Sequence, residues 1–200
     1  MQDNQLTKTR LTTQLWIGVL CAALEFGLYY LYQHIFNPLP LYMDTLFTTA
    51  ASFFGPISGC ICAFLFHAIS IFIFKYPLYN FAWSICSFSV VLIIRLYVSI
   101  RKKSIGKKLE VLDIVLLVFI VALIISIEGA LIFTTLNFIV NYTEDSQVRF
   151  MFAFLSQNNV STFISALLPR VPVNILDKGI CVTLGYFAFK GMKKLFNRKR

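Results

Sequence analysis

Long apolar segments dominate this sequence and limit what it can fold into. The segments 78–100 and 111–140 are each long enough to cross the ~30 Å hydrocarbon core of a bilayer, which takes about 20 residues in a helix. Of all residues, 58% are hydrophobic and only 14% are charged, whereas a soluble domain must place charge over most of its surface. We therefore expect an all-α integral membrane protein. The composition excludes a soluble enzyme and a disordered protein.

Six apolar segments can be drawn as transmembrane helices, and residues 1–200 then form a single membrane domain. The Gly55-Pro56 pair predicts a tight reversal between the second and third segments, because proline suits the first turn of a helix. The stretch of about 146–168 mixes apolar and polar runs, which predicts an outer lid or an interfacial helix. The expected spans are about 14–32, 42–54, 56–74, 78–100, 111–140 and 172–190.

The basic residues predict how the helices are oriented. Lysine and arginine in short loops are retained on the cytoplasmic side of a membrane. Six spans place all three basic clusters on one side, whereas five or seven spans would leave at least one cluster outside. We therefore expect a multi-pass protein of the cell membrane with both termini cytoplasmic, and the formal charge of +9 reflects this topology. The clusters are Lys8 with Arg10, residues 101–108, and residues 190–200.

The richest group of polar and ionisable residues lies in the stretch 168–178. A charged side chain at the middle of a membrane helix costs roughly 2.5–3.5 kcal/mol on insertion scales, so each one needs a partner or a role. Pro169 and Pro172 predict that the sixth span begins at Pro172, where free backbone N–H groups would favour an anionic or polar ligand. The predicted substrate contacts from this stretch are Arg170, Asn174, Asp177 and Lys178.

Two acidic residues outside this stretch are expected to support the same site. They are Glu128, in the fifth span, and Asp44, at the outer start of the second span. The alternative interpretation is structural: Asp177, Lys178 and Glu128 would neutralise one another and hold the fifth and sixth spans together.

The other ionisable residues within the spans carry weaker predictions. Glu25 is either a proton or ion site or a hydrogen-bond partner of a neighbouring helix. His67 is expected to pack or hydrogen-bond between helices, and Arg95 to snorkel toward the cytoplasm. No catalytic set and no metal site can be assembled from the sequence, so we expect neither enzyme activity nor a cofactor.

A face of small residues on the first span predicts a docking surface. Gly18 and Ala22 are four residues apart in the cytoplasmic half of this span, where they would let a helix of a partner approach closely.

Three motifs occur in a characteristic order along the chain: LPLYMDT at 39–45, GPISG at 55–59 and PVNILDK at 172–178. With six spans, this order resembles the substrate-binding S components of energy-coupling factor transporters. The resemblance implies an S-component-like bundle that captures a vitamin or similar micronutrient from outside. It also implies a complex with a scaffold transmembrane subunit and two ATPases, within which the S component topples to release its cargo. That family usually docks through Ala-xxx-Ala, so Gly18 is a departure.

We thus expect a substrate-capture subunit whose partners are a small molecule, the scaffold, the ATPase pair and membrane lipid, and not nucleic acid. A sensory or signalling membrane module is one alternative, but such modules usually feed a cytoplasmic output domain. An ion-coupled carrier that uses Glu25 or Glu128 is the other. The substrate itself cannot be predicted, because a few side-chain changes on one scaffold change the ligand.

Overall fold

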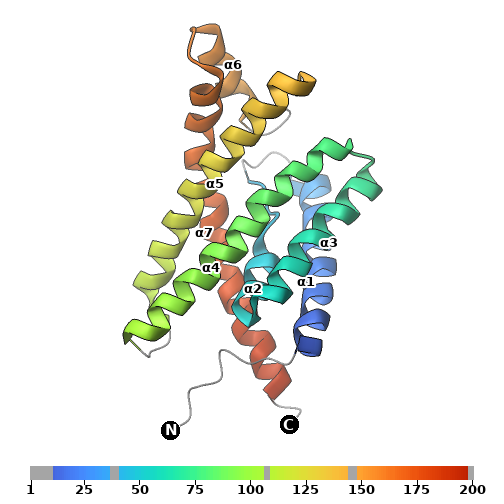
Figure 1. Cartoon of the computed structure of the whole chain (residues 1–200), viewed down its shortest axis with the longest axis vertical. Helices are drawn as coiled ribbons and strands as arrows, with labels where there is room; N and C mark the ends of the chain where they lie inside the picture. Colours follow the sequence, from blue (N-terminus) through green and yellow to red (C-terminus); the bar gives the residue numbers. More distant parts are fainter. Residues whose placement is uncertain (1–10, 37–40, 106–108, 144–147, 198–200) are drawn as a thin grey trace.

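The protein is a bundle of helices, and its computed structural model describes residues 11–36, 41–105, 109–143 and 148–197 (Figure 1). These ranges contain no β-strand. In chain order the elements are α1 (Leu11–Leu31), the π-helix η1 (Tyr32–Phe36), α2 (Leu46–Phe54), α3 (Pro56–Phe74), the 3-10 helix η2 (Leu78–Trp83), α4 (Ser84–Ile105), α5 (Val111–Val140), α6 (Arg149–Gln157) and α7 (Thr162–Asn197).

Within the described part of the chain, four helical stretches are long and apolar enough to cross a membrane: Leu11–Ile35, Pro56–Phe74, Leu78–Arg101 and Val111–Val140. Large apolar side chains cover their outward faces, including Phe119 on α5. Soluble monomers rarely expose a continuous apolar surface of this size. The fold is therefore compatible with a multi-pass membrane protein, as the sequence predicts.

The short helix α2 forms the centre of the bundle. Its nine residues rise about 13 Å, less than half of the hydrocarbon thickness. It contacts α1, α3, α4 and α7, and every residue in it except Phe47 is buried. The predicted span 42–54 is thus helical only from Leu46, and protein rather than lipid covers it.

The predicted reversal at Gly55-Pro56 is confirmed, since α2 ends at Phe54 and α3 begins at Pro56. The backbone N–H of Gly55 donates to the carbonyl of Ala51 at 3.2 Å. The Ser58 hydroxyl lies within hydrogen-bonding distance of the carbonyls of Ala51, at 2.6 Å, and Gly55, at 2.9 Å. These bonds satisfy the Ala51 carbonyl, one of those that the end of α2 leaves without a partner in the helix.

The predicted start of a helix at Pro172 is wrong. The helix α7 runs unbroken for 36 residues with Pro169 and Pro172 inside it. A broken helix at membrane depth would leave several backbone groups without partners, whereas each proline inside a helix removes only one N–H. The stretch expected to form a lid, 146–168, contributes α6 and the first turns of α7. No helix N-terminus is therefore available at Pro172 to bind an anion.

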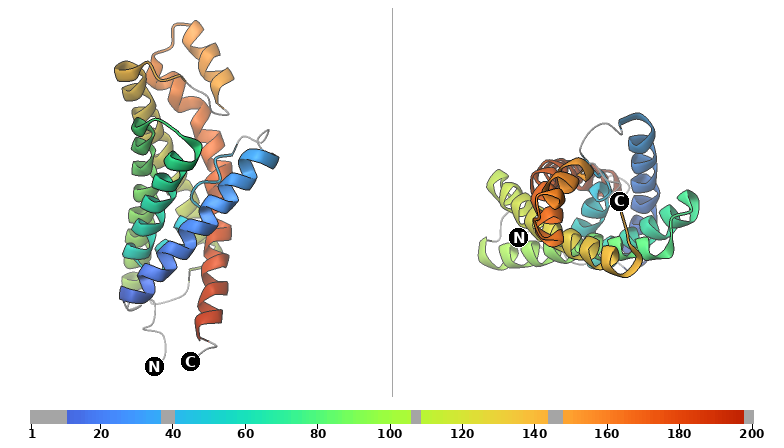
Figure 2. Two further views of the ribbon diagram at one scale, coloured as in Figure 1. Left: turned by 90° about the vertical axis from the view of Figure 1, so that its right-hand side faces the viewer. Right: turned by 90° about the horizontal axis from the view of Figure 1, so that it is seen from above.

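The described chain starts and ends at the same end of the bundle, where α1 begins and α7 finishes (Figures 1 and 2). The helix α4, which carries Arg101 near its C-terminus, also ends there. Lys190 and Lys194 lie in the last turns of α7. Lys8 and Arg10 of the predicted first cluster lie outside the described residues. The described residues of the second and third predicted clusters thus lie toward one end of the bundle.

Candidate functional site

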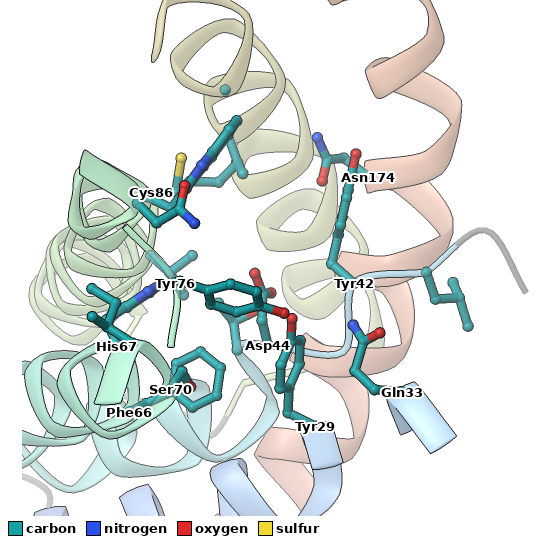
Figure 3. Close-up of a pocket in the computed structure, with 18 of the residues that line it drawn as sticks. Tyr29, Gln33, Tyr42, Asp44, Phe66, His67, Ser70, Tyr76, Cys86 and Asn174 are labelled. Atoms are coloured by element: carbon teal, nitrogen blue, oxygen red, sulfur yellow. The ribbon is translucent and has the colours of Figure 1, made fainter. Parts of the chain in front are cut away.

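A cavity of about 460 Å³ lies among the helices, and Figure 3 shows residues that line it. The lining includes Tyr29 near the end of α1 and Asn174 in the first half of α7, so the cavity lies in the half of the bundle away from the start of α1 and the end of α7. Small-molecule sites commonly measure about 300–1,000 Å³. Its walls come from α1, η1, the segment 41–45, α3, the segment 76–83, α4, α5 and α7. Aromatic residues form much of the lining: Tyr29, Tyr32, Tyr42, Phe66, Tyr76, Tyr79, Trp83 and Tyr142.

Lys178 ties α7 to the segment that precedes α2. This side chain is buried, and its ammonium donates to Asp44 Oδ1 and to Thr45 Oγ1, both at 2.9 Å. The ammonium also forms an ion pair with Asp177 Oδ2 at 2.7 Å. An ammonium group has three N–H donors, and the two hydrogen bonds use two of them. Lys178 therefore lines the cavity with its charge neutralised by protein carboxylates.

Asp177 fixes the same segment through the backbone. Its Oδ1 accepts hydrogen bonds from the N–H groups of Tyr42, at 2.9 Å, and Met43, at 2.8 Å. Met43 has a φ of 51°, in the left-handed region that side chains other than glycine seldom adopt. The carboxylate thus stabilises a strained turn. Asp177, a predicted substrate contact, is fully buried but is not among the residues that line the cavity.

Glu25, which lies on the neighbouring helix α1, caps the N-terminus of α2. Its carboxylate accepts from the backbone N–H of Leu46 at 2.9 Å and from that of Thr48 at 2.6 Å. The N-cap residue Thr45 makes no side-chain capping bond of its own, because its hydroxyl binds Lys178. Glu25 supplies the missing acceptor and places negative charge where the helix dipole favours it. This is the hydrogen-bonding role that the sequence left open.

Neighbouring residues determine which end of the Asn174 amide is the oxygen and therefore where its acceptor lies. The hydroxyl of Ser126 donates to the carbonyl of Ala122 at 2.7 Å, so its oxygen must accept from Asn174 Nδ2, at 3.0 Å. Asn174 Oδ1 is therefore the other end of the amide, and it is buried without a hydrogen-bond partner among the described residues. The same holds for Ser70 Oγ and Asn80 Oδ1, and all three residues line the cavity.

Arg170 occupies the wall where α5 and α7 meet. The side chain is buried, and its Nη1 donates to the carbonyl of Ala166 at 2.8 Å. The guanidinium carbon lies 5.1 Å from the centre of the Phe133 ring and 5.9 Å from that of Trp83. Contacts between a cation and the face of an aromatic ring are attractive. Arg170 thus joins the aromatic wall to α7.

The structure brings together four of the predicted substrate residues and separates two others. Asp44, Arg170, Asn174 and Lys178 line the cavity, whereas Asp177 and Glu128 do not. Glu128 accepts a hydrogen bond from the Ser89 hydroxyl at 2.7 Å, which joins α5 to α4. The proposed neutralisation of Lys178 by Glu128 is therefore wrong, because Asp44 is the second partner of Lys178.

The predictions for His67 and Arg95 have different outcomes. His67 Nε2 hydrogen-bonds with Ser87 Oγ at 2.8 Å, which confirms a contact between α3 and α4, and His67 also lines the cavity. Arg95 does not simply reach outward, because its Nη1 donates to the carbonyl of Ser52 at 3.3 Å. The sequence does not single out Ser70 and Asn80 as site residues, since small polar residues near apolar helices carry no distinguishing pattern.

The predicted docking face on α1 is turned toward α3. A Cβ atom added to Gly18 would lie 2.9 Å from both Ile61 Cβ and the carbonyl oxygen of Ser58. Ala22 is only 1% exposed. These small residues let two helices of the same chain approach closely. The prediction is corrected accordingly: in this structure neither residue is available to a partner.

No family model, curated protein or solved structure matches this chain. The relation to S components therefore stays a prediction that depends on the three sequence motifs.

Proposed function

We propose that this chain is the membrane-embedded substrate-capture subunit of an importer of the energy-coupling factor type, which takes up a vitamin or similar micronutrient. The cavity is the observation that carries the proposal. It combines aromatic walls with buried oxygen atoms that lack partners among the described residues, namely those of Ser70, Asn80 and Asn174. A buried polar group without a partner costs about 1–3 kcal/mol, so a bound molecule that satisfies it gains affinity.

The charge distribution supports one orientation of the protein in the membrane. The described residues of the predicted basic clusters, among them Arg101, Lys190 and Lys194, lie toward the end of the bundle where α1 begins and α7 finishes, and the cavity lies in the other half. Placing the basic end in the cytoplasm makes the cavity face the exterior, as capture from outside requires. In this arrangement the chain crosses the cell membrane six times, with α2 and the segment before it as the second crossing.

Uptake against a gradient requires partners in this proposal. The sequence contains no GxxxxGK[ST] phosphate-binding loop, so ATP hydrolysis belongs to two separate ATPase subunits, joined through a scaffold transmembrane subunit. Because Gly18 and Ala22 are buried against α3, the scaffold would contact other side chains of the bundle.

The test is to purify the protein in mild detergent and to identify bound small molecules by mass spectrometry. We expect the wild type to retain a small organic molecule and Asn174→Leu to retain at least about tenfold less, because the substitution removes a buried acceptor. Thr134→Val is the matched control. Thr134 also lies on one of the helices that form the cavity and donates to the carbonyl of Ala130 at 2.7 Å, but it does not line the cavity.

A second measurement concerns the partners. The tagged chain, expressed in its own host, is expected to co-purify with an ATPase pair and a scaffold membrane protein. A preparation that holds no small molecule and captures no ATPase would contradict the proposal. Uptake by vesicles that contain this chain alone and no ATP would favour the ion-coupled carrier instead.

A further inference from the structure

We infer that the molecule held in the cavity is an uncharged, planar ring compound that presents N–H or O–H donors to the protein. This inference rests on the proposed capture function and adds the chemical class of its substrate. Hydrogen-bonding capacity, charge balance and the shape of the walls each support it.

Three buried oxygen atoms of the described cavity lining have no hydrogen-bond partner, and the two amide oxygens among them can only accept. Asn174 offers Oδ1, because Ser126 holds the amide nitrogen in place. Asn80 Oδ1 and Ser70 Oγ are likewise buried without partners among the described residues. A carboxylate or phosphate presents only acceptors, so it would leave the two amide oxygens unsatisfied. A ring N–H, an exocyclic amino group or a hydroxyl would satisfy them.

These acceptors lie on different walls of the cavity. Figure 3 shows Ser70 with His67 on the wall formed by α3, and Asn174 on the facing wall formed by α7. A ligand that reaches both must carry polar groups at two edges. This arrangement is typical of heterocycles whose donors lie around the rim of a flat ring.

The charges around the cavity are balanced without a ligand. Two cations, Arg170 and Lys178, and one carboxylate, Asp44, line the cavity, and a second carboxylate, that of Asp177 behind the lining, is paired with Lys178. Glu25 lies outside the lining, and the backbone N–H groups of α2 accommodate its charge. An ionic ligand would therefore add a net charge to a group of residues that is already neutral overall, which is costly away from water.

The walls provide flat surfaces for a ring. Tyr29 and Tyr76 lie next to each other beside the cavity in Figure 3, and Phe66 lies on the adjacent wall. Trp83 completes the aromatic lining near α4. Aromatic side chains favour a planar partner through offset stacking and edge-to-face contacts. A linear or bulky saturated compound would use this surface poorly.

The test uses matched ring compounds in titration calorimetry with the detergent-purified protein. Uracil and nicotinamide are uncharged and carry N–H donors. Their controls are 1,3-dimethyluracil, which has the same ring without donors, and orotate and nicotinate, which add a carboxylate. We expect at least one donor-bearing neutral compound to bind at least about tenfold more tightly than its blocked and anionic analogues.

The variants test the assigned orientation of the Asn174 amide. Asn174→Leu should remove the preference for the donor-bearing compound. Ser126→Ala should reduce the preference while the amide stays, because nothing then fixes which end of it faces the ligand. Thr134→Val should leave the preference unchanged.

The outcomes separate this inference from the proposed function. Equal or tighter binding of an anionic or donor-blocked analogue would overturn the inference and leave capture intact. If no compound of the panel binds but a molecule co-purifies, its structure decides: a neutral ring with donors supports the inference, and a charged or donor-free molecule overturns it. If no compound binds and none co-purifies, the capture function itself fails.

Discussion

Replacing Lys178 with methionine removes a buried cation and keeps a side chain of similar length. The carboxylates of Asp44 and Asp177 would then lose their shared counter-ion. Breaking a buried ion pair from one side typically costs about 3–5 kcal/mol, because a charge is left without compensation. The Asp44 side chain is 30% exposed and can recruit water, whereas Asp177 is fully buried. We therefore expect a loss near the lower limit, about 3 kcal/mol.

For a chain of this size, that loss corresponds to a decrease in Tm of roughly 6–12 °C. The measurement is unfolding of the detergent-solubilised protein followed by circular dichroism, both on heating and in mixed micelles of rising denaturing-detergent content. Asp177→Asn should be more harmful than Asp44→Asn, because Asp177 also accepts from two backbone N–H groups and is less exposed.

The double variant Lys178→Met with Asp177→Asn makes the test specific to the pair. Residues in direct contact show coupling of about 0.5–3 kcal/mol, so the double variant should lose at least about 1 kcal/mol less than the sum of the single variants. A loss below about 1 kcal/mol for Lys178→Met, or simple additivity in the double variant, would refute the assigned network.

Three further predictions use the same unfolding measurement. Glu25→Ala should cost about 2–4 kcal/mol, because it leaves two buried amides of α2 without an acceptor, and Glu25→Gln should recover part of the loss. Gly18→Ala should cost about 1–3 kcal/mol by pushing α1 away from α3. Gly27→Ala in the same helix, with no atom within 4 Å of the added Cβ, should be neutral or stabilise by up to about 1 kcal/mol; equal losses at both glycines would argue against the close contact. Asp113→Ala should cost about 1–3 kcal/mol and speed hydrogen exchange at the start of α5, since it removes the ion pair with Arg101 and half of a capping box; unchanged exchange there would count against the cap.

Local sequence signals predicted several helix boundaries correctly. The Gly55-Pro56 reversal appears as expected, and the helix predicted over 111–140 has the same bounds in the structure. The helix boundary predicted from Pro169 and Pro172 was wrong. The residue before a proline disfavours helical backbone, so helices end there more often than elsewhere but not always. In a membrane, keeping the other backbone hydrogen bonds outweighs the bond that each proline removes.

The site was harder to predict than the helices because its key contacts are distant in sequence. The stretch that contains Asn174 and Lys178 was identified from the density of polar groups in an apolar chain. Its partners were not, since Asp44 contacts Lys178 across 134 positions and no periodicity connects them. The role of Glu25 depends on where α2 starts, and that start follows from tertiary packing.

The unbroken length of α7 has a mechanical consequence. At 36 residues the helix extends about 54 Å, well beyond the ~30 Å of hydrocarbon that it would cross. Such a rod behaves as a lever with a long arm on either side of its midpoint. Rotation by about 10° around its midpoint would displace each tip by roughly 5 Å. Because Asp177 and Lys178 fasten the rod near its middle to the segment before α2, movement of that segment at the cavity can be transmitted to the basic tip without any bend in between.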